Sequence, residues 1–395
     1  MGLPDVRAEA TIRNYMGSLI FVVSGGFVLY VLFGYPLFAA LRARRRTLPI
    51  RKAPVMKPVT LLLPVRNGEA FLARKLESIL RLDYPRDLVQ ILVISDGSTD
   101  RTDEIAKGYG ASGVELVRIP HSGKATALNA GMDLARGEIL FFTDVRQVLD
   151  PASLRYLVEC FADPAVGVVS GELIIVEGET REEADVGLYW RYEKWIRKHL
   201  SRIDSVLGAT GCVYAMRREL SVTLPANTLL DDVYLPLAAF FRGFRIVMEE
   251  RARAFDSPTS LRTEFSRKVR TLAGVYQLVS AFPALLGPDN RMWIDFVSHK
   301  IGRLLLPFAL IGLAASSFTL PGFWRPVILA SQALFYGAAA ADAVVPESWF
   351  LKRATSPVRT FVVLMAASLC ATSIFFRPGQ SLWKQTRVTA AKPFP

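Results

Sequence analysis

Five charged residues have the types and positions that could bind and activate a phosphate-bearing ligand. Asp96 and Asp144 each follow a short apolar run, Lys124 lies between them, and Asp231 and Asp232 form an adjacent pair. Carboxylates accept hydrogen bonds and bind metal ions, and an ammonium group neutralises phosphate oxygens. A carboxylate can also take the proton of an attacking hydroxyl. These residue types suit a nucleoside diphosphate and general-base chemistry.

The elements that carry these residues alternate between strand and helix. Apolar runs predict strands over residues 58–65, 89–95, 115–119 and 138–143, with helices after Asn67 and over residues 124–135. This alternation predicts an α/β fold with a parallel, doubly wound sheet, which binds ligands outside the carboxyl ends of its strands. The alternative, that Asp96 and Asp144 only cap turns, explains less well why both follow strands. Neither a phosphate-loop motif nor a glycine-rich dinucleotide fingerprint is present, which argues against P-loop ATPases and NAD enzymes.

The composition divides the chain between water and membrane. Of 395 residues, 51% are hydrophobic and 21% charged, and the formal net charge is +12. The charge fits either nucleic acid or anionic lipid, and its position beside long apolar runs favours lipid and no nucleic-acid partner. Residues 18–41 predict a transmembrane helix, and the arginines that follow at 42, 44, 45 and 46 predict a cytosolic continuation rather than the cleavage site of a signal peptide.

The C-terminal part of the chain returns to the membrane. Residues 272–286 predict an interfacial helix, and residues 304–320, 327–345 and 361–376 predict three spans. Lys352, Arg353 and Arg359 indicate that the loop before the last segment is cytosolic. A third span would then place a basic tail outside the cytosol. The last segment is therefore either interfacial, or its tail is translocated despite its charge.

Four motifs resemble the nucleotide-sugar-binding half of glycosyltransferase family 2. They are Pro64-Val-Arg-Asn-Gly68, Ile94-Ser-Asp-Gly-Ser-Thr-Asp100, Gly123-Lys-Ala-Thr-Ala-Leu-Asn129 and Phe142-Thr-Asp144. Within that family the chain resembles the membrane-embedded branch of hyaluronan, chitin, cellulose and poly-N-acetylglucosamine synthases, over roughly residues 59–274. The resemblance implies a GT-A fold, a UDP-sugar donor, a divalent metal such as Mg²⁺ or Mn²⁺, and inversion at the anomeric carbon.

The resemblance also implies roles on the donor side. Asp96 matches the acid that contacts the nucleoside, and Lys124 matches a lysine near the donor. Asp144 matches the first acid of the D-x-D motif that binds metal and diphosphate. Position 146 departs from this motif, because Arg146 stands where the second acid is expected. An arginine would repel the metal and could itself pair with phosphate oxygens.

The acceptor side is expected from two later segments. Tyr189 to Trp195 is rich in aromatic residues, so Trp190 and Trp195 could border a sugar groove, although an amphipathic helix packed on the sheet explains the same pattern. A loop of small residues contains Thr210 and Gly211, and small residues let the backbone approach a ligand closely. The family places the donor sugar or the acceptor terminus against this loop.

The acidic pair and a later basic segment complete the predicted site. By resemblance, Asp232 is the catalytic base and Asp231 its neighbour, and two adjacent carboxylates should raise one apparent pKa. Acids at a helix N-terminus, favoured by the helix dipole, are the structural alternative. Arg270 matches the arginine of the family's Q-x-x-R-W motif, and Arg267 adds positive charge for the leaving UDP. Thr271 replaces the tryptophan of that motif, which puts the synthesis of long chains in doubt.

The expected organisation has three parts. Residues 1–57 form a membrane helix and basic linker, residues 58–274 a cytosolic GT-A domain, and residues 275–395 an interfacial helix with about three spans. The expected protein is a multi-pass enzyme of the bacterial plasma membrane that transfers a hexosyl or N-acetylhexosaminyl group to a sugar or lipid-linked saccharide, for extracellular or capsular polysaccharide. Membrane lipids, a second copy or other synthase subunits are its expected partners. Transfer to a polyprenyl phosphate and a non-catalytic synthase subunit are the alternatives.

Overall fold

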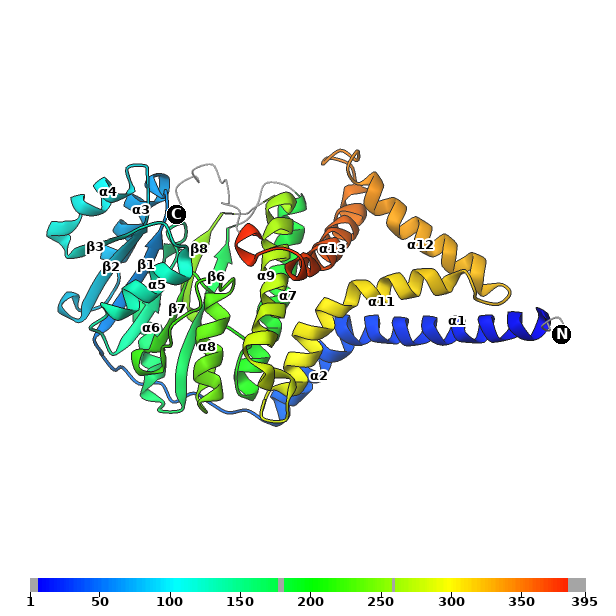
Figure 1. The fold of residues 1–395 in the computed structure, drawn as a ribbon, viewed down its shortest axis with the longest axis horizontal. Helices are drawn as coiled ribbons and strands as arrows, with labels where there is room; N and C mark the ends of the chain where they lie inside the picture. Colours follow the sequence, from blue (N-terminus) through cyan, green and yellow to red (C-terminus); the bar gives the residue numbers. More distant parts are fainter. Residues whose placement is uncertain (1–5, 177–180, 258–259, 383–395) are drawn as a thin grey trace.

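The computed structural model describes residues 6–176, 181–257 and 260–382, and its body is built on a mixed sheet (Figure 1). The eight strands of the described residues lie in the order β3-β2-β1-β4-β7-β6-β8-β5. Their bounds are β1 Val59–Val65, β2 Val89–Asp96, β3 Val114–Ile119, β4 Ile139–Phe142, β5 Val148–Leu149, β6 Val166–Ile175, β7 Tyr214–Arg217 and β8 Arg245–Asp256.

The sheet is parallel where the sequence predicts it and antiparallel beyond. Strands β1, β2, β3 and β4 pair in parallel, so the α/β prediction is confirmed. Strand β7 lies between β4 and β6 and runs antiparallel to both, which makes the sheet mixed. Because Tyr214 at the start of β7 pairs with Phe142 at the end of β4, the loop before β7 reaches the same sheet edge as Asp144.

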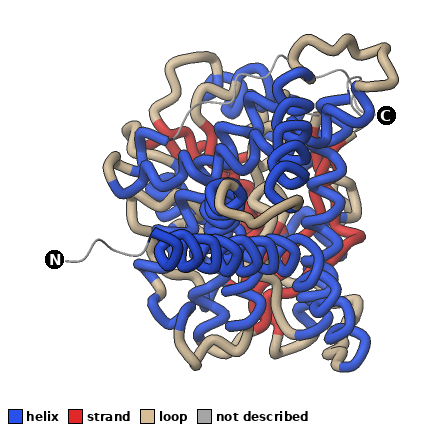
Figure 2. Tube along the Cα trace, turned by 90° about the vertical axis from the view of Figure 1, so that its right-hand side faces the viewer, coloured by secondary structure: helices blue, strands red, loops and turns tan. Residues whose placement is uncertain are grey.

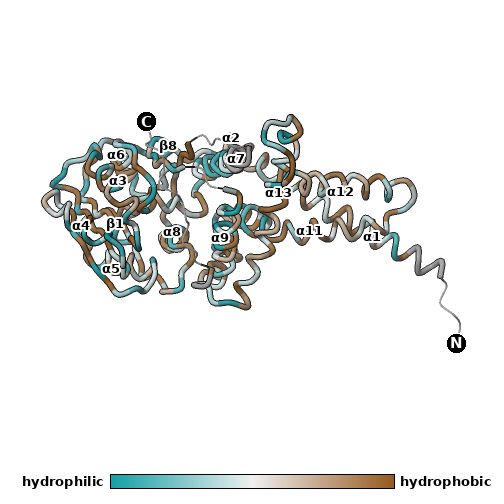
Figure 3. The backbone as a smooth tube through the Cα atoms, turned by 90° about the horizontal axis from the view of Figure 1, so that it is seen from above, coloured by the Kyte–Doolittle hydropathy of each residue, from teal (hydrophilic) through white to brown (hydrophobic). Residues whose placement is uncertain are grey.

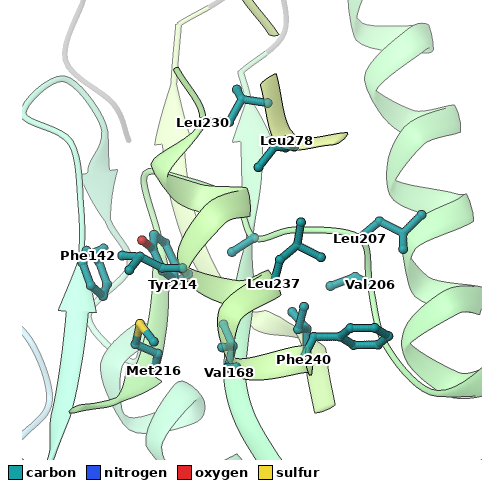
Figure 4. Packing of buried hydrophobic residues seen from close by; sticks show 14 of the residues in the cluster. Phe142, Val168, Val206, Leu207, Tyr214, Met216, Leu230, Leu237, Phe240 and Leu278 are labelled. Carbon is teal, nitrogen blue, oxygen red and sulfur yellow. The ribbon is translucent and has the colours of Figure 1, made fainter. Parts of the chain in front are cut away.

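Helices cover both faces of the sheet and bury its apolar side chains. The helices of this body are α3 Glu69–Leu80, α4 Thr102–Gly108, α5 Lys124–Asp133, α6 Ser153–Glu159, α7 Arg181–Ile203, α8 Asp231–Phe241 and α9 Leu261–Ala281. On one face, the ring of Phe142 stacks on that of Tyr214 at 4.5 Å, and Leu237 and Phe240 of α8 pack nearby (Figure 4). This packing holds the end of β4, the start of β7 and the second half of α8 together.

A helical arm projects from the body. It contains α1 Val6–Leu29, α11 Gly302–Ser317 and α12 Trp324–Ala341, and hydrophobic colours run along α11 and α12 (Figure 3). In the described residues, three helices are long and apolar enough to cross a membrane: Ile12–Arg45, Trp293–Ser317 and Lys352–Phe375. Helix α12 covers most of the predicted segment 327–345 but is not among these three. The sequence prediction of membrane helices on both sides of the sheet domain therefore has a structural counterpart.

A polar cluster at the base of the arm links the two helices that lead into it. Here α2 Tyr35–Arg45 continues the first helix, and α10 Trp293–Asp295 begins the helix that leads into α11. The buried carboxylate of Asp295 accepts hydrogen bonds from Tyr35 Oη at 3.1 Å and Arg42 Nη1 at 2.9 Å. These bonds connect two segments that are far apart in sequence.

The last helix returns to the body. Helix α13, Lys352–Ala371, contacts α9 and α7 as well as α12. Viewed along the arm, the helices stand in front of the sheet (Figure 2). The predicted interfacial segment 272–286 forms the end of α9 and a 3-10 turn over Pro283–Leu286.

We expect Gly137→Ala to destabilise the sheet that carries Asp144. A methyl group at Gly137 would lie 2.5 Å from Thr60 N and 2.6 Å from Val59 C, which are backbone atoms of the neighbouring strand. Overpacking of this kind costs about 1–3 kcal/mol. Thermal unfolding of the detergent-purified protein measures the effect. Gly108→Ala is the matched control, since nothing lies within 4 Å of its new methyl group, and equal unfolding temperatures for the two variants would contradict the expectation.

Candidate active site

One cavity of about 1030 Å³ lies at the edge where β1, β2 and β4 end. Helices α5, α7, α8 and α9 and the start of the helix Trp293–Ser317 complete its wall. Nearly all site residues predicted from the sequence line this cavity: Asp96, Lys124, Asp144, Arg146, Trp190, Thr210, Gly211, Asp231, Asp232, Arg267 and Arg270. Trp195 is not among the lining residues, and the residue is 42% exposed. The fold therefore gathers residues from more than half of the chain around one space.

Lys124 is the central cation of the cavity. Its Nζ lies 3.0 Å from Asp144 Oδ1 and 3.2 Å from Asp231 Oδ2. Burial acts to lower the pKa of Lys124, but the carboxylates of Asp144, Asp231 and Asp232 outweigh it and raise the pKa above its usual range. Lys124 is therefore a permanent positive charge that links the end of β4 to the first turn of α8.

Asp96 organises the loop that leads to Lys124. Its buried carboxylate accepts hydrogen bonds from Ser122 N at 2.6 Å and Gly123 N at 3.1 Å, and it pairs with His121 Nδ1 at 3.0 Å. Gly123 has a φ of 91°, a left-handed conformation that favours glycine. Asp96 thus holds the turn before α5 against the end of β2 while it faces the cavity.

Asp231 and Asp232 begin α8, and their environments differ. Asp231 is buried and pairs with Lys124, whereas the carboxylate of Asp232 has no hydrogen bond or ion pair to any residue that the structure describes. Burial and the neighbouring charge of Asp231 raise the pKa of Asp232 to about 6. Their position in the first turn of a helix agrees with the structural alternative too. The geometry leaves Asp232 as the carboxylate that can take a proton near neutral pH.

Arg146 does not replace the second acid of the D-x-D motif as a metal ligand. Its guanidinium pairs with the buried carboxylate of Asp256 at 2.5 Å, and Gln147 Nε2 donates to the same oxygen at 2.8 Å. No group of three acids, histidines or cysteines in the described residues can hold a metal ion. Of the two acid positions of the D-x-D motif, only Asp144 carries a carboxylate here, and its side chain is 39% exposed. One carboxylate fits a metal whose other ligands are phosphate oxygens and water.

The wall formed by α7 and α9 brings cations onto aromatic rings. Arg267 and Lys268 each lie 5.1 Å from the ring centroid of Trp190, and Lys268 lies 4.1 Å from that of Tyr189. Cations over aromatic faces attract electrostatically, more strongly when they are desolvated. Trp195 instead packs against His199 at a centroid distance of 4.2 Å. Trp190 is therefore the tryptophan of this segment that faces the cavity.

The loop of small residues approaches the acidic pair. Ala209 N donates to the backbone oxygen of Asp232 at 2.7 Å, and a methyl group on Gly211 would lie 3.0 Å from Asp232 Oδ2. Thr210 N donates to Ser170 Oγ at 2.9 Å, which also accepts from Arg197 Nη2 at 2.8 Å. A side chain at position 211 would therefore crowd the carboxylate of Asp232.

Lys75 is a buried residue that the sequence prediction missed. It lies on the apolar face of α3, and its Nζ donates to Thr143 Oγ1 at 2.6 Å and to the backbone oxygen of Gln147 at 2.8 Å. These acceptors flank Asp144 in sequence. Burial lowers the pKa of Lys75 to about 7. A lysine inside an otherwise apolar helix face was the only signal in the sequence.

A second missed group comes from the arm. Glu193 of α7 accepts from His299 Nε2 at 3.0 Å and from Arg303 Nη1 at 2.5 Å. Burial would raise the pKa of Glu193, but Arg303 and His299 hold it well below its usual range. Lys300 also lines the cavity. His299, Lys300 and Arg303 lie just before the predicted span 304–320, and no motif in the sequence assigned them to the site.

The fold is of the GT-A type, and comparisons with known proteins indicate the family of its sheet domain. Residues 60–223 match the family model "Glycosyl transferase family 2". The chain is similar to the probable glycosyltransferase YdaM of Bacillus subtilis, with 27% identity over 70% of this chain and 67% of that protein. The chain therefore carries a glycosyltransferase family 2 domain and is a glycosyltransferase. Asp231, Asp232, Arg267 and Arg270 lie beyond the matched residues.

The chain is also similar to a polysaccharide synthase in sequence and to a mannosyltransferase in fold. Poly-beta-1,6-N-acetyl-D-glucosamine synthase of Staphylococcus epidermidis is 34% identical over 29% of this chain, which spans only 28% of that synthase. The mannosyltransferase PcManGT from Pyrobaculum calidifontis, solved with GDP-Man and Mn²⁺, has a TM-score of 0.69 at 23% identity. That alignment covers 89% of this chain and 97% of the mannosyltransferase. The fold similarity thus extends beyond residues 60–223, which the family model matches.

We expect Lys75→Met to disturb the turn that presents Asp144. Methionine fits the apolar volume but leaves Thr143 Oγ1 and the Gln147 carbonyl without this donor, and an unmet buried polar group costs about 1–3 kcal/mol. The kcat/KM for transfer should fall by roughly tenfold or more, and the Mn²⁺ concentration for half activity should rise. Lys107→Met, on the exposed surface of α4, is the control. An unchanged metal requirement would show that Lys75 does not position Asp144.

The pKa of Asp232 predicts the pH dependence of transfer. A base acts as the carboxylate, so kcat/KM should rise with pH through about 6 and level off above it. Asp231→Asn removes a neighbouring negative charge that favours protonation of Asp232. The acid limb of the variant should therefore move to lower pH, whatever its maximal rate. A pH–rate profile of both proteins checks this, and a limb that moves to higher pH would contradict it.

Proposed function

We propose that this glycosyltransferase moves a sugar from a nucleoside-diphosphate donor, a UDP-sugar as the sequence resemblance implies, to a hydroxyl of a saccharide or lipid-linked saccharide at a membrane. The observation that carries the proposal is the carboxylate of Asp232. It has no partner among the described residues and lies beside the Lys124 cluster. The attacking hydroxyl needs a general base next to the donor site, and an unpaired carboxylate can accept its proton.

The proposed reaction inverts the anomeric carbon in one displacement. The acceptor oxygen bonds to that carbon while the bond to the donor phosphate oxygen breaks, and Asp232 receives the hydroxyl proton. The nucleoside diphosphate leaves with both electrons of the broken bond. Lys124 and Arg270, whose charges act on the same acids, lie where they can offset its developing negative charge.

The donor site would use a divalent metal. Mg²⁺ or Mn²⁺ held by Asp144 would neutralise the diphosphate, with the substrate supplying the remaining ligands. GDP-Man and Mn²⁺ in the similar mannosyltransferase support a nucleotide sugar and a metal, but the base of the donor differs from the predicted uridine. The turn around Asp96 is where a nucleoside is expected. Comparison of UDP- and GDP-sugars therefore belongs in the first experiment.

The membrane supplies the setting for the acceptor. The arginines at 42, 44, 45 and 46 support a cytosolic sheet domain, and the contacts of α13 with α7 and α9 support an interfacial last helix. The similar proteins include a beta-monoglucosyldiacylglycerol synthase of Synechocystis, 27% identical over 34% of its length. Extracellular or capsular polysaccharide is the proposed purpose. Direct transfer to a polyprenyl phosphate needs less help from a base, so Asp232 favours a sugar hydroxyl instead.

We expect Asp232→Asn to lower transfer by roughly 10²–10⁴-fold, because asparagine cannot accept the proton. Release of nucleoside diphosphate by the detergent-purified protein, with membrane extract as acceptor source, measures turnover across UDP- and GDP-sugars with and without Mn²⁺. One donor should support release that needs both the metal and Asp232.

Asn227→Asp is the control for a change at the cavity wall that leaves the acids intact, because Asn227 lines the cavity outside the acid cluster. Equal release by Asp232→Asn and the unmodified protein would remove Asp232 as the base. It would also favour the alternative of a non-catalytic synthase subunit.

A further inference from the structure

The cavity has a basic end that the proposed donor chemistry does not use. We define the basic annex as Arg197 of α7, Lys268 of α9, and Lys300 and Arg303 of the helix Trp293–Ser317. All four line the cavity, and each of its three helices contributes at least one cation. The annex therefore forms where the arm meets the sheet domain.

The annex carries more positive charge than the protein neutralises. The cavity lining contains nine lysines and arginines against five carboxylates. Two carboxylates pair with annex residues: Glu193 pairs with Arg303 as well as with His299, and Glu264 lies 3.6 Å from Lys268 Nζ. The side-chain ammonium of Lys300 has no ion pair or hydrogen bond to a described residue. Because cations in a closed space are costly without a counter-ion, the annex is suited to an anionic ligand.

The charges with the largest effects on Lys300 differ from those on Lys124. The charges that act on Lys300 are those of Glu193, Arg303, Arg197 and Lys268. The charges that act on Lys124 are instead those of Asp144, Asp231 and Asp232.

Arg197 connects the two groups, because both Glu193 and Asp232 act on it. Its guanidinium donates to Ser170 Oγ and to the carbonyl of Gly208 at 3.1 Å, beside the loop that meets Asp232. The annex thus adjoins the small-residue loop that meets Asp232.

Two annex residues lie on a candidate membrane helix, which favours a ligand that comes from the membrane. Lys300 lies in a π-helical turn, Phe296–Ile301, and Arg303 follows on the same candidate membrane helix. Single π-turns inside helices are frequent at functional sites. The Nε1 of Trp190, another lining residue, is buried without a hydrogen-bond partner in the described residues. A ligand that enters along the arm would meet these donors before it reaches Asp232.

We propose that the basic annex binds the phosphate group of a membrane-lipid acceptor, with Lys300 and Arg303 as its principal donors. This inference rests on the proposed function and gives its acceptor a chemical class. The phosphate would hold the lipid at the membrane surface while its sugar hydroxyl reaches Asp232. An acceptor made only of neutral sugar gives no reason for cations on a membrane helix, whereas a phosphate forms charge-assisted hydrogen bonds with them.

Binding of three small probes to the full chain tests the proposal. Farnesyl monophosphate, farnesol and inorganic phosphate are titrated by calorimetry into the detergent-purified protein in the presence of UDP. Farnesyl monophosphate should bind at least about tenfold more tightly than either other probe, because it alone combines the lipid and the phosphate. Lys300→Met should weaken its binding by roughly tenfold or more, as expected from the loss of a hydrogen bond to a charged group. Lys300→Arg should bind nearly as the unmodified protein does.

Arg44→Met is the matched control, because Arg44 is an exposed cation on α2 outside the cavity lining. Equal binding of farnesyl monophosphate and farnesol, or no effect of Lys300→Met, would overturn the proposal. Inorganic phosphate that binds as tightly as farnesyl monophosphate would overturn the lipid part and assign the annex to free phosphate.

Measurements with the donor distinguish failure of the annex proposal from failure of the proposed function. Lys300→Met should keep the Kd of the donor, whereas failure of the proposed function would appear as no donor turnover in the unmodified protein.

Discussion

The pairing of Lys124 with Asp144 and Asp231 is the interaction on which the site depends. It brings together the end of β4, the start of α5 and the first turn of α8, although Lys124 and Asp231 are far apart in sequence. Three acids within reach of one another would repel in a low-dielectric cavity, and the ammonium group offsets that repulsion. Because Lys124 is committed to Asp144 and Asp231, Asp232 keeps a free carboxylate with a raised pKa.

Backbone geometry supports this pairing at both ends. The carboxylate of Asp96 holds the turn before Lys124 through the N–H groups of Ser122 and Gly123, and Lys75 holds the turn that carries Asp144. These buried groups are satisfied by hydrogen bonds, so they fix the turns rather than destabilise them. The turns that carry Lys124 and Asp144 are therefore held in place by hydrogen bonds within the protein, without a ligand.

The arm makes the cavity part of a larger arrangement than a sheet edge. Glu193 ties α7 to His299 and Arg303, and Asp295 ties α10 to Arg42 and Tyr35. Both carboxylates are buried or nearly so and pair across segments distant in sequence. Loss of one partner of such a pair is expensive, so the membrane helix and the sheet domain should hold a defined relative position. This rigidity allows a membrane helix to supply residues to the cavity of a glycosyltransferase.

The sequence alone determined the parallel strands β1 to β4, because period and composition distinguish buried strands from helices, and it determined which residues follow those strands. The motifs around Asp96, Lys124 and Asp144 were therefore predictable, as was the family that the comparisons support. Only the tertiary structure decided that β7 runs antiparallel, that Arg146 pairs with Asp256, and that Trp190 rather than Trp195 faces the cavity. It also brought Lys300 and Arg303 to the site. Contacts between distant segments depend on packing, and local sequence patterns carry no information about which distant partner a side chain meets.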